Sequence, residues 1–390
     1  MGTTEQSVAS EPARRVRFDR NEFSGAFGDL GTDFPLLVGM ILAAGLDAGS
    51  VLTAFGVMQI LTGLLYGLPM PVQPLKAMAV IVITQRVTAP VLYGGGLAIG
   101  VAMLLLALTG LVDALARVVP KVVVRGIQFG LGLQLATLAL KEYVGAEGRP
   151  GYALALAAFL LTVALLGNRR FPPAPWVILL GILYALLVRW DAGWPPAGAG
   201  FRLPSLHWPA VQDVATGFLV LALPQLPLSL GNSILATRQL AADLFPERPV
   251  SVRRISLSYA LMNLLNPLLG GVPTCHGSGG MAGHYAFGAR TGGSVVIYGA
   301  MYLGLGLLLS GAFHTVVLLF PKPVLGVILL FEALALVAPA RDAAASKGDF
   351  SLMLLTGFLA AGLPYGYVIA LVAGTALAWP ARRGRTVFSR

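Results

Sequence analysis

The sequence predicts an all-α polytopic membrane protein, and three features carry that prediction. Of its 390 residues, 56% are hydrophobic and only 11% are charged, roughly half the charged share of a soluble domain. Apolar runs recur from Phe34 to Trp379 with short polar gaps, and a helix needs about 20 such residues to cross a bilayer. The 48 glycines and 26 prolines are typical of broken helices and close helix contacts in membranes. The lipid bilayer is therefore the expected solvent of nearly the whole chain.

Apolar stretches between charges and Gly/Pro breaks predict about 14 segments in two sets of seven. The first set lies near residues 24–45, 50–68, 71–84, 94–116, 121–140, 151–167 and 174–188. The second set lies near residues 213–236, 252–269, 273–288, 294–318, 323–340, 350–362 and 364–379. Segments 3 and 10 are short and begin in Pro/Gly-rich chain, at 69–74 and 270–273. Each is therefore expected to be a half-helix that follows an extended stretch.

The two sets echo each other at an offset near 200 residues: Pro120-Lys121 matches Pro321-Lys322, and Met78-Ala79 matches Met281-Ala282. A unit of seven crossings ends on the side opposite to its start, so the second copy must be inverted. The sequence thus predicts two inverted seven-segment repeats, at 21–190 and 213–380. An N-terminal tail at 1–20, a connection at 191–212 and a C-terminal tail at 381–390 complete the chain.

Charge placement predicts the orientation. If the N-terminus is cytoplasmic, the inside segments hold nineteen Lys and Arg residues and the outside segments hold six, namely Arg86, Lys141, Arg149, Arg189, Arg202 and Lys322. This bias favours cytoplasmic N- and C-terminal tails, an extracellular 191–212 connection and a cell (inner) membrane location. The net charge of +10 is spread over loops and tails, so we expect no nucleic-acid partner.

Lys76 is the first candidate for binding chemistry because polar groups at membrane depth are costly. It lies just inside segment 3, in the run Pro71-Val72-Gln73-Pro74-Leu75-Lys76. A half-helix that starts near the bilayer middle points free N–H groups at a cavity, and Lys76 would add a full charge beside them. The alternative is a lysine that reaches an interface or pairs with an acid elsewhere.

Segment 10 offers a matching start, in which small residues let an anion approach backbone N–H groups. The candidate substrate-binding residues there are Thr274, Cys275, His276, Gly277, Ser278 and Gly279. Tight helix packing is the alternative role for the glycines. Cys275 and His276 lack further ligands at useful spacing, so no metal site and no cofactor are expected.

Two helix starts contribute about +0.5 each and Lys76 about +1, so the predicted site favours a dianion. Segment 1 carries Asp29 and Asp33 on one helical face; they are candidate proton carriers, counter-charges to Lys76, or helix caps. At the matching place in the second repeat, Gln225 and Asn232 are neutral donors suited to an oxyanion.

Two further charged residues, Arg125 and Glu332, lie within predicted segments. Arg125 is a candidate gate or structural ion pair, and Glu332 is expected to be paired or neutral, with a coupling role as an alternative. No nucleophile, base and orienting group occur together at membrane depth, so the chain is not expected to be an enzyme.

Five motifs in order resemble those of the molybdate transporter family, a branch related to the sulfate permeases. They are Gly-Asp-Leu-Gly-Thr at 28–32, Pro-Val-Gln-Pro-Leu-Lys-Ala at 71–77, Val-Arg-Gly-Ile-Gln at 124–128, Pro-Gln-Leu-Pro-Leu-Ser-Leu-Gly-Asn-Ser at 224–233 and Cys-His-Gly-Ser-Gly-Gly at 275–280. The resemblance implies a core domain and a gate domain, each drawing on both repeats. It also implies that the substrate lies between half-helices 3 and 10, which points to Gln73, Lys76, His276, Gly277, Ser278 and Gly279. Nucleobase carriers of the same fold place acids in segments 8 and 10, whereas here segment 10 has none and segment 8 has only Asp213, at its first position.

The expected function is secondary active transport of a tetrahedral oxyanion, molybdate first and sulfate second, by an elevator-like motion. Importing a dianion against 100 mV costs about 5 kcal/mol, so we expect coupling to protons, with Asp29, Asp33 or Glu332 as carriers. A passive anion channel on the same fold is the alternative. A homodimer is an expected assembly.

Overall fold

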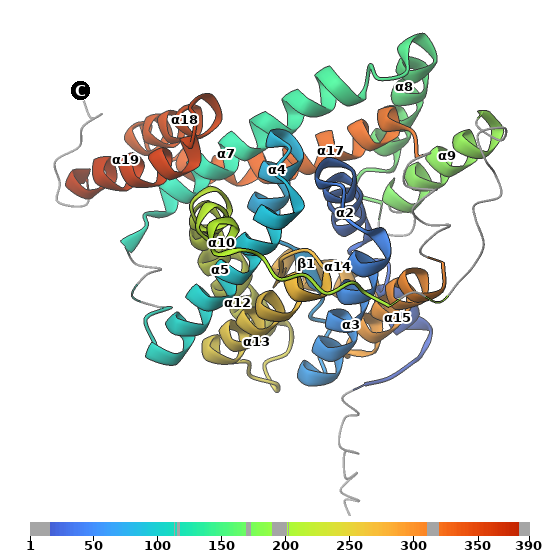
Figure 1. Ribbon diagram of the computed structural model, residues 1–390, viewed down its shortest axis with the longest axis horizontal. Helices are drawn as coiled ribbons and strands as arrows, with labels where there is room; N and C mark the ends of the chain where they lie inside the picture. The colour runs from blue at the N-terminus through green and yellow to red at the C-terminus, as the bar shows by residue number, and fades with distance from the viewer. Residues whose placement is uncertain are drawn as a thin grey trace, which may run out of the picture.

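The computed structural model describes residues 16–112, 114, 118–168, 173–188, 201, 203–309 and 320–381. Over these ranges the chain is almost wholly helical, with two three-residue strands near the centre of the molecule (Figure 1). The all-α prediction is therefore confirmed. Most of the predicted tails at 1–20 and 381–390, half of the 191–212 connection, and the ends of the predicted segments 94–116 and 294–318 lie outside the described residues.

The first half of the chain contains one strand and a series of helices. They are α1 (Arg20–Gly25), α2 (Leu30–Ala44), α3 (Ala48–Tyr66), β1 (Val72–Pro74), α4 (Lys76–Gln85), α5 (Ala89–Thr109), α7 (Lys121–Leu138), the π-helical turn η1 (Ala139–Tyr143), α8 (Gly148–Leu165) and α9 (Pro173–Val188).

The second half has a similar order. It comprises α10 (Val211–Gly217), η2 (Phe218–Ala222), α11 (Leu223–Leu228), η3 (Ser229–Leu235), α12 (Ala236–Leu244), α13 (Val252–Leu265), η4 (Pro267–Leu269), β2 (Thr274–His276), α14 (Ser278–Ala286), α15 (Gly293–Leu308), α17 (Lys322–Val337), η5 (Ala338–Ala343), α18 (Lys347–Gly362) and α19 (Gly366–Ala381). In both halves a short strand leads directly into a short helix.

Six helical stretches among the described residues are long and apolar enough to cross a membrane. They are Ala48–Tyr66, Ala89–Thr109, Lys121–Tyr143, Gly148–Leu165, Val211–Leu244 and Lys322–Ala343. Several shorter apolar helices, among them Leu30–Ala44 and Gly293–Leu308, accompany them. The chain is a multi-pass membrane protein.

Local sequence explains where several helices begin and end. The Asp47 carboxylate accepts a hydrogen bond from the Ser50 N–H at 2.7 Å and caps α3, which satisfies one of the free donors of the first turn. The same helix ends at Gly67, whose φ of 64° is left-handed and is accessible to glycine without steric cost. The turn that follows directs the chain into β1.

The long helical stretch from Val211 to Leu244 is interrupted by π-helical turns. Pro224 and Pro227 lie between η2 and η3, and each proline removes a backbone donor and crowds the carbonyl of the preceding turn. Wider π-helical turns relieve this conflict and are common at functional sites. They present one face of this stretch, including Gln225 and Asn232, to the centre of the molecule.

The helices pack in two groups. The first group is called the strand group here because α3 contacts β1 and α13 contacts β2. It contains α3, α5, α10, α13 and α15; α3 packs on α15, and α5 packs on α10 and α13. The outer group contains α7, α8, α17, α18 and α19, in which α7 packs on α17 and α18. Figure 1 shows the two groups on opposite sides of the molecule, with α2 and α4 between them. The polar residues described below, among them Lys76 and Glu332, lie where α4 meets the outer group.

Candidate functional site

The two short strands cross at the centre and pair antiparallel, with Gln73 opposite Cys275. Side chains alternate between the two faces of a strand, so Gln73 and Cys275 share one face and their neighbours point to the other. Both of these side chains line the central cavity described below. The strands end where α4 and α14 begin, so the starts of the two half-helices lie at opposite ends of this short ladder, and both line the central cavity.

The outer edges of both strands are covered by side-chain amides. The Gln59 amide nitrogen donates to the Val72 carbonyl at 2.7 Å, and the Val72 N–H donates to Gln59 Oε1 at 2.8 Å. In the second half, the Asn263 amide donates to the Thr274 carbonyl at 2.6 Å and accepts from the Thr274 N–H at 2.9 Å. Backbone groups at membrane depth need such partners, so these two amides hold the strands in place.

A cavity of about 350 Å³ lies in front of the strands, between them and the outer group. It is lined by Gln73, Lys76, Arg125, Gln128, Gln225, Leu228, Asn232, Ser233, Cys275, Gly277, Ser278, Gly279, Ala335, Leu336 and Pro339. The first turns of α4 and α14 both contribute to this lining. The cavity has room for a small ion and contains one lysine and one arginine.

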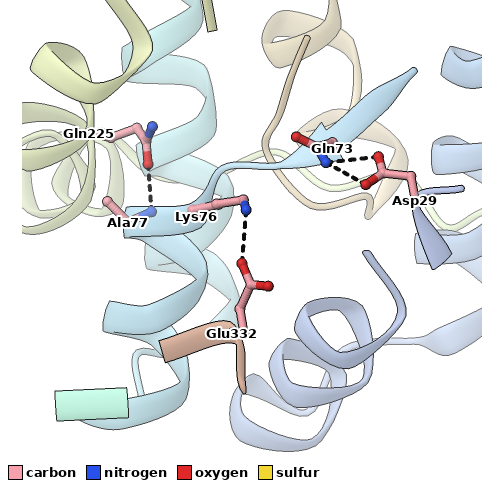
Figure 2. Close-up of polar contacts among 6 residues, drawn as sticks. All are labelled: Asp29, Gln73, Lys76, Ala77, Gln225 and Glu332. Atoms are coloured by element: carbon pink, nitrogen blue, oxygen red, sulfur yellow. Dashed lines mark hydrogen bonds and ion pairs between the residues drawn. The ribbon is translucent and has the colours of Figure 1, made fainter. Parts of the chain in front are cut away.

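Lys76 forms an ion pair across the interface between the two helix groups. Its Nζ lies 2.9 Å from Oε1 of Glu332 on α17 (Figure 2). Glu332 is 6% exposed and the lysine side chain 32% exposed, so the lysine is the partner that reaches the cavity. A buried carboxylate needs such a partner because an isolated charge is expensive to bury.

Gln225 caps the start of α4. Its side-chain oxygen accepts from the N–H groups of Ala77 at 2.9 Å and Met78 at 3.2 Å (Figure 2). The Gln225 amide nitrogen donates to Ser229, whose hydroxyl is 2.7 Å from that of Tyr259. The N–H groups expected to face an anion at this helix start are therefore engaged by a neutral acceptor.

Asp29 and Asp33 lie at the turn before α2 and in its first turn, and both are buried. Both carboxylate oxygens of Asp29 accept from the Gln73 amide nitrogen, at 2.7 and 2.8 Å (Figure 2). Asp33 accepts from the Tyr298 hydroxyl at 3.3 Å. Asp29 occupies the N-cap position of α2, but its side chain makes no capping hydrogen bond to that helix.

Arg125 lies at the other end of the cavity. It donates to Asp342 on η5 at 2.8 Å and to Gln128 at 2.9 Å, and Lys121 joins the same carboxylate at 3.0 Å. A second cavity of about 250 Å³ shares Arg125 and Asn232 with the central one and is also lined by Lys121. Basic residues therefore line both cavities: Lys76 and Arg125 line the central one, and Arg125 and Lys121 line the second.

A family model described as "Molybdate transporter of MFS superfamily" matches residues 21–135 and 217–336. Molybdate transporter 1 of Arabidopsis thaliana is 34% identical over 91% of this chain and 87% of its own length, and Molybdate transporter 2 of the same plant is 33% identical over 92% and 89%. The chain belongs to the molybdate transporter family. The family assignment expected from the motifs is thus confirmed, and the relatives are named as transporters and not as enzymes.

Solved structures show which fold this member of the molybdate transporter family adopts. Murine Solute Carrier 26 family member A9, an anion transporter in the inward-facing state, matches with a TM-score of 0.70 at 15% identity, over 95% of this chain and 69% of its own. The transmembrane domain of the cyanobacterial bicarbonate transporter BicA matches with a TM-score of 0.64 at 17% identity, over 91% and 96%. At these identities the likeness concerns the fold alone.

Two of the expected substrate-binding residues, Thr274 and His276, do not line the cavity. Thr274 and His276 alternate with Cys275 along β2 and point to its other face. The Thr274 hydroxyl accepts from Asn266 at 2.9 Å, and His276 Nε2 is 2.7 Å from the Ser258 hydroxyl. The motif placed these residues near the site, but the period of the strand decides which of their side chains face it.

Other residues of the site were missed by the motif-based prediction. Gln59 and Asn263, which hold the strands, lie inside apolar helices where an amide is an unexpected residue. An amide within an otherwise apolar helix was the feature of the sequence that could have identified both residues. Of the two residues that surround Arg125, Gln128 lies in the Val-Arg-Gly-Ile-Gln motif but was not singled out as a site residue. Asp342 gave no comparable signal, because polar residues are ordinary near the ends of membrane helices.

Proposed function

We propose that this protein is a secondary active transporter of a small tetrahedral oxyanion, with molybdate as the first candidate and sulfate as the second. One observation carries the proposal: the starts of two half-helices and a lysine meet at a cavity of about 350 Å³, in a chain of the molybdate transporter family. A compact site with positive charge and backbone donors suits a dianion.

The proposed binding groups come from both half-helices. Lys76 supplies the charge, and Gly279 supplies backbone that an anion can approach closely, because an added Cβ there would meet nothing within 4 Å. At Gly277 the Gln73 side chain occupies that space. Ser278, Asn232 and Gln73 are the neutral polar side chains of the lining. Neutral donors of this kind fix the orientation of an oxyanion without adding charge.

We infer an architecture of two inverted seven-segment repeats. Two pairs of equivalent features support it: α4 and α14 each follow a strand, and Gln59 and Asn263 make the same paired bonds to those strands. With inverted repeats, the strand group and its half-helices form a core domain, and the outer group forms a gate domain. The core then carries the anion past the gate in an elevator-like motion. The charge placement favours an orientation in which both termini are cytoplasmic.

Proton coupling belongs to the same proposal because a dianion entering against 100 mV needs about 5 kcal/mol. Asp29 and Glu332 lie next to the groups that line the cavity, so protons are the simplest coupling ion. A passive anion channel on the same fold is the alternative, and it would show no accumulation against a gradient.

The test is uptake of labelled molybdate into liposomes that contain the purified protein. We expect accumulation above the external concentration when an inward proton gradient is imposed, and loss of uptake of at least tenfold in Lys76→Ala, since a buried charge-assisted contact is worth about 1.5–3 kcal/mol. Lys322→Ala is the matched control, because Lys322 starts α17 and does not line the cavity. Equal uptake by Lys76→Ala and the unmodified protein would contradict the proposed site.

Sulfate and molybdate are separated by a second measurement. Competitive binding of the two anions to the purified protein, followed by calorimetry, should give tighter binding of molybdate. Tighter binding of sulfate would reverse the order of the two candidates and leave the class of transporter unchanged.

A further inference from the structure

The donors that face the cavity from β1 and α4 are already engaged by acceptors of the protein. Gln73 donates its amide hydrogens to Asp29, Lys76 donates to Glu332, and the first N–H groups of α4 donate to Gln225. Figure 2 shows the three contacts side by side along β1 and the start of α4. Two of the three acceptors are carboxylates, and the third is neutral.

The contact with Asp29 also decides which end of the Gln73 amide faces away from it. With the nitrogen directed at Asp29, the amide oxygen points to the other side (Figure 2). It fills the space beside Gly277, where an added Cβ would lie 1.5 Å from Gln73 Oε1. An oxygen in this position repels an oxyanion, whereas the nitrogen would bind it.

Protonation of Asp29 would reverse the Gln73 amide. A carboxylate only accepts hydrogen bonds, but a carboxylic acid also donates one. A protonated Asp29 can donate to Gln73 Oε1 after the amide has turned by half a rotation, which keeps one hydrogen bond between the two residues. The Gln73 nitrogen is then free on the cavity side. By the same logic, protonation of Glu332 removes the charge that holds Lys76.

We propose that Asp29 and Glu332 each take up one proton when the oxyanion binds, so that Gln73 and Lys76 are released to hold it. This inference rests on the proposed function and assigns its coupling residues and a ratio of two protons to one dianion. The protons come from the solution on the side from which the anion arrives, and no covalent bond is made or broken except those to the two protons.

Charge balance supports the ratio. When both acids are ionised, Lys76, Asp29 and Glu332 together carry one net negative charge. With two protons added and a dianion bound, the same group again carries one net negative charge. Binding therefore leaves the charge of a buried region unchanged, which matters because uncompensated charge at membrane depth is costly.

Asp33 is a less suitable carrier than either acid, although it is buried one turn away. It accepts from Tyr298 and holds none of the donors that face the cavity. Other charged or titratable groups also surround the two proposed carriers. They are Lys76 on α4, Asp33 on α2, Arg125 on α7, Cys275 on β2, His284 on α14, and Tyr298 and Tyr302 on α15.

The experiment counts the protons taken up per molybdate ion bound. Calorimetric titration of the purified protein with molybdate is repeated in buffers of different ionisation enthalpy, and the slope against that enthalpy gives the number of protons. We expect a value near two where both acids are ionised in the free protein. Linkage then requires the affinity to fall about hundredfold for each unit of rising pH in that range.

Three variants assign the protons to residues. Asp29→Asn and Glu332→Gln mimic the protonated acids, so each should keep molybdate binding, lower the proton count to one and reduce the pH dependence to about tenfold per unit. The double variant should bind with no proton uptake. The matched control is Glu142→Gln. Like Glu332, Glu142 pairs with a basic residue, here Arg86 at 3.0 Å, but it is exposed at the surface, so the proton count of this variant should stay near two.

Each outcome bears on one proposal or the other. Molybdate binding without proton uptake, or a proton count that falls in Asp33→Asn but not in Asp29→Asn, would overturn the assignment and leave the transporter proposal standing. No molybdate binding by the unmodified, folded protein would overturn the proposed function itself. Gel filtration and thermal unfolding show whether each variant is folded before it is titrated.

Discussion

At the scale of single residues, neighbouring side chains on β1 and α4 depend on distant partners. Gln73 and Lys76 lie three positions apart, but Gln73 binds Asp29 and Lys76 binds Glu332, 256 positions away. A dianion about 4 Å from an ionised carboxylate is repelled by roughly 8 kcal/mol at an effective dielectric constant near 20. This repulsion offsets most of the attraction that Lys76 exerts on the anion, so an ionised Glu332 opposes binding beside Lys76.

Asn263 provides a prediction at this scale. It is fully buried and satisfies both backbone groups of Thr274, and each buried group left without a partner costs about 1–3 kcal/mol. We expect Asn263→Leu to lower the melting temperature of the detergent-solubilised protein by several degrees. Leu261→Ala, an exposed position on the same helix, should change it little. An unchanged melting temperature in Asn263→Leu would show that β2 does not need this amide.

At the scale of elements, α4 with 10 residues and α14 with 9 residues are each too short to cross a bilayer, which takes a helix of about 20 residues. Close packing behind them fixes where they start. On α15, a Cβ added at Gly299 would lie 2.7 Å from both Gln59 Cβ and the Gly56 carbonyl oxygen, whereas one added at Gly304 meets nothing within 4 Å. The contact of α3 with α15 therefore depends on the first glycine and not on the second.

A pair of substitutions on α15 tests this packing. Gly299→Ala should destabilise the protein by about 1–3 kcal/mol, because Gln59 and the backbone of α3 must move apart. Gly304→Ala should be neutral or stabilising by up to about 1 kcal/mol, because alanine favours a helix interior over glycine. Thermal unfolding in detergent compares the two, and equal destabilisation would contradict the difference in packing. Displacement of Gln59 should also weaken its bonds to β1.

At the scale of the whole molecule, α4 is the element that joins the two helix groups by polar contacts. Besides the Lys76–Glu332 pair, the Thr84 hydroxyl is 3.4 Å from Gln134 on α7, and Arg86 pairs with Glu142 on η1. The Gln134 carbonyl also accepts from Tyr367 on α19. If the strand group and α4 move as proposed, the contacts of Lys76, Thr84 and Arg86 must break in every cycle, whereas the contact of Gln134 with Tyr367 lies within the outer group and can persist.

A disulfide across this interface tests the motion. With Cys275→Ser removing the native cysteine, Thr84→Cys and Gln134→Cys together should form a cross-link that stops molybdate uptake, and a reductant should restore it. Each single cysteine variant in the same background should be insensitive to oxidation. Full uptake by fully cross-linked protein would mean that α4 and α7 do not move apart during transport.

The sequence by itself determined the class of the protein and singled out Lys76 as a candidate for its site. Hydrophobic composition and segment length are properties of the chain alone, so they predict a membrane protein with interrupted helices in any packing. The same holds for Lys76, because a lysine that follows a Pro-rich stretch within an apolar run stands out without reference to a partner. The motifs added the family, which the comparisons confirmed.

Only the tertiary structure decided which polar groups meet. The pairing of β1 with β2 turned Cys275 toward the cavity and Thr274 and His276 away from it, and the approach of α17 gave Lys76 its carboxylate. The tertiary structure also showed that Gln225 accepts from the start of α4 and that Asp29 accepts from Gln73. Hydrogen bonds and ion pairs act over about 3 Å, a distance that spacing along the chain does not specify for residues on different helices.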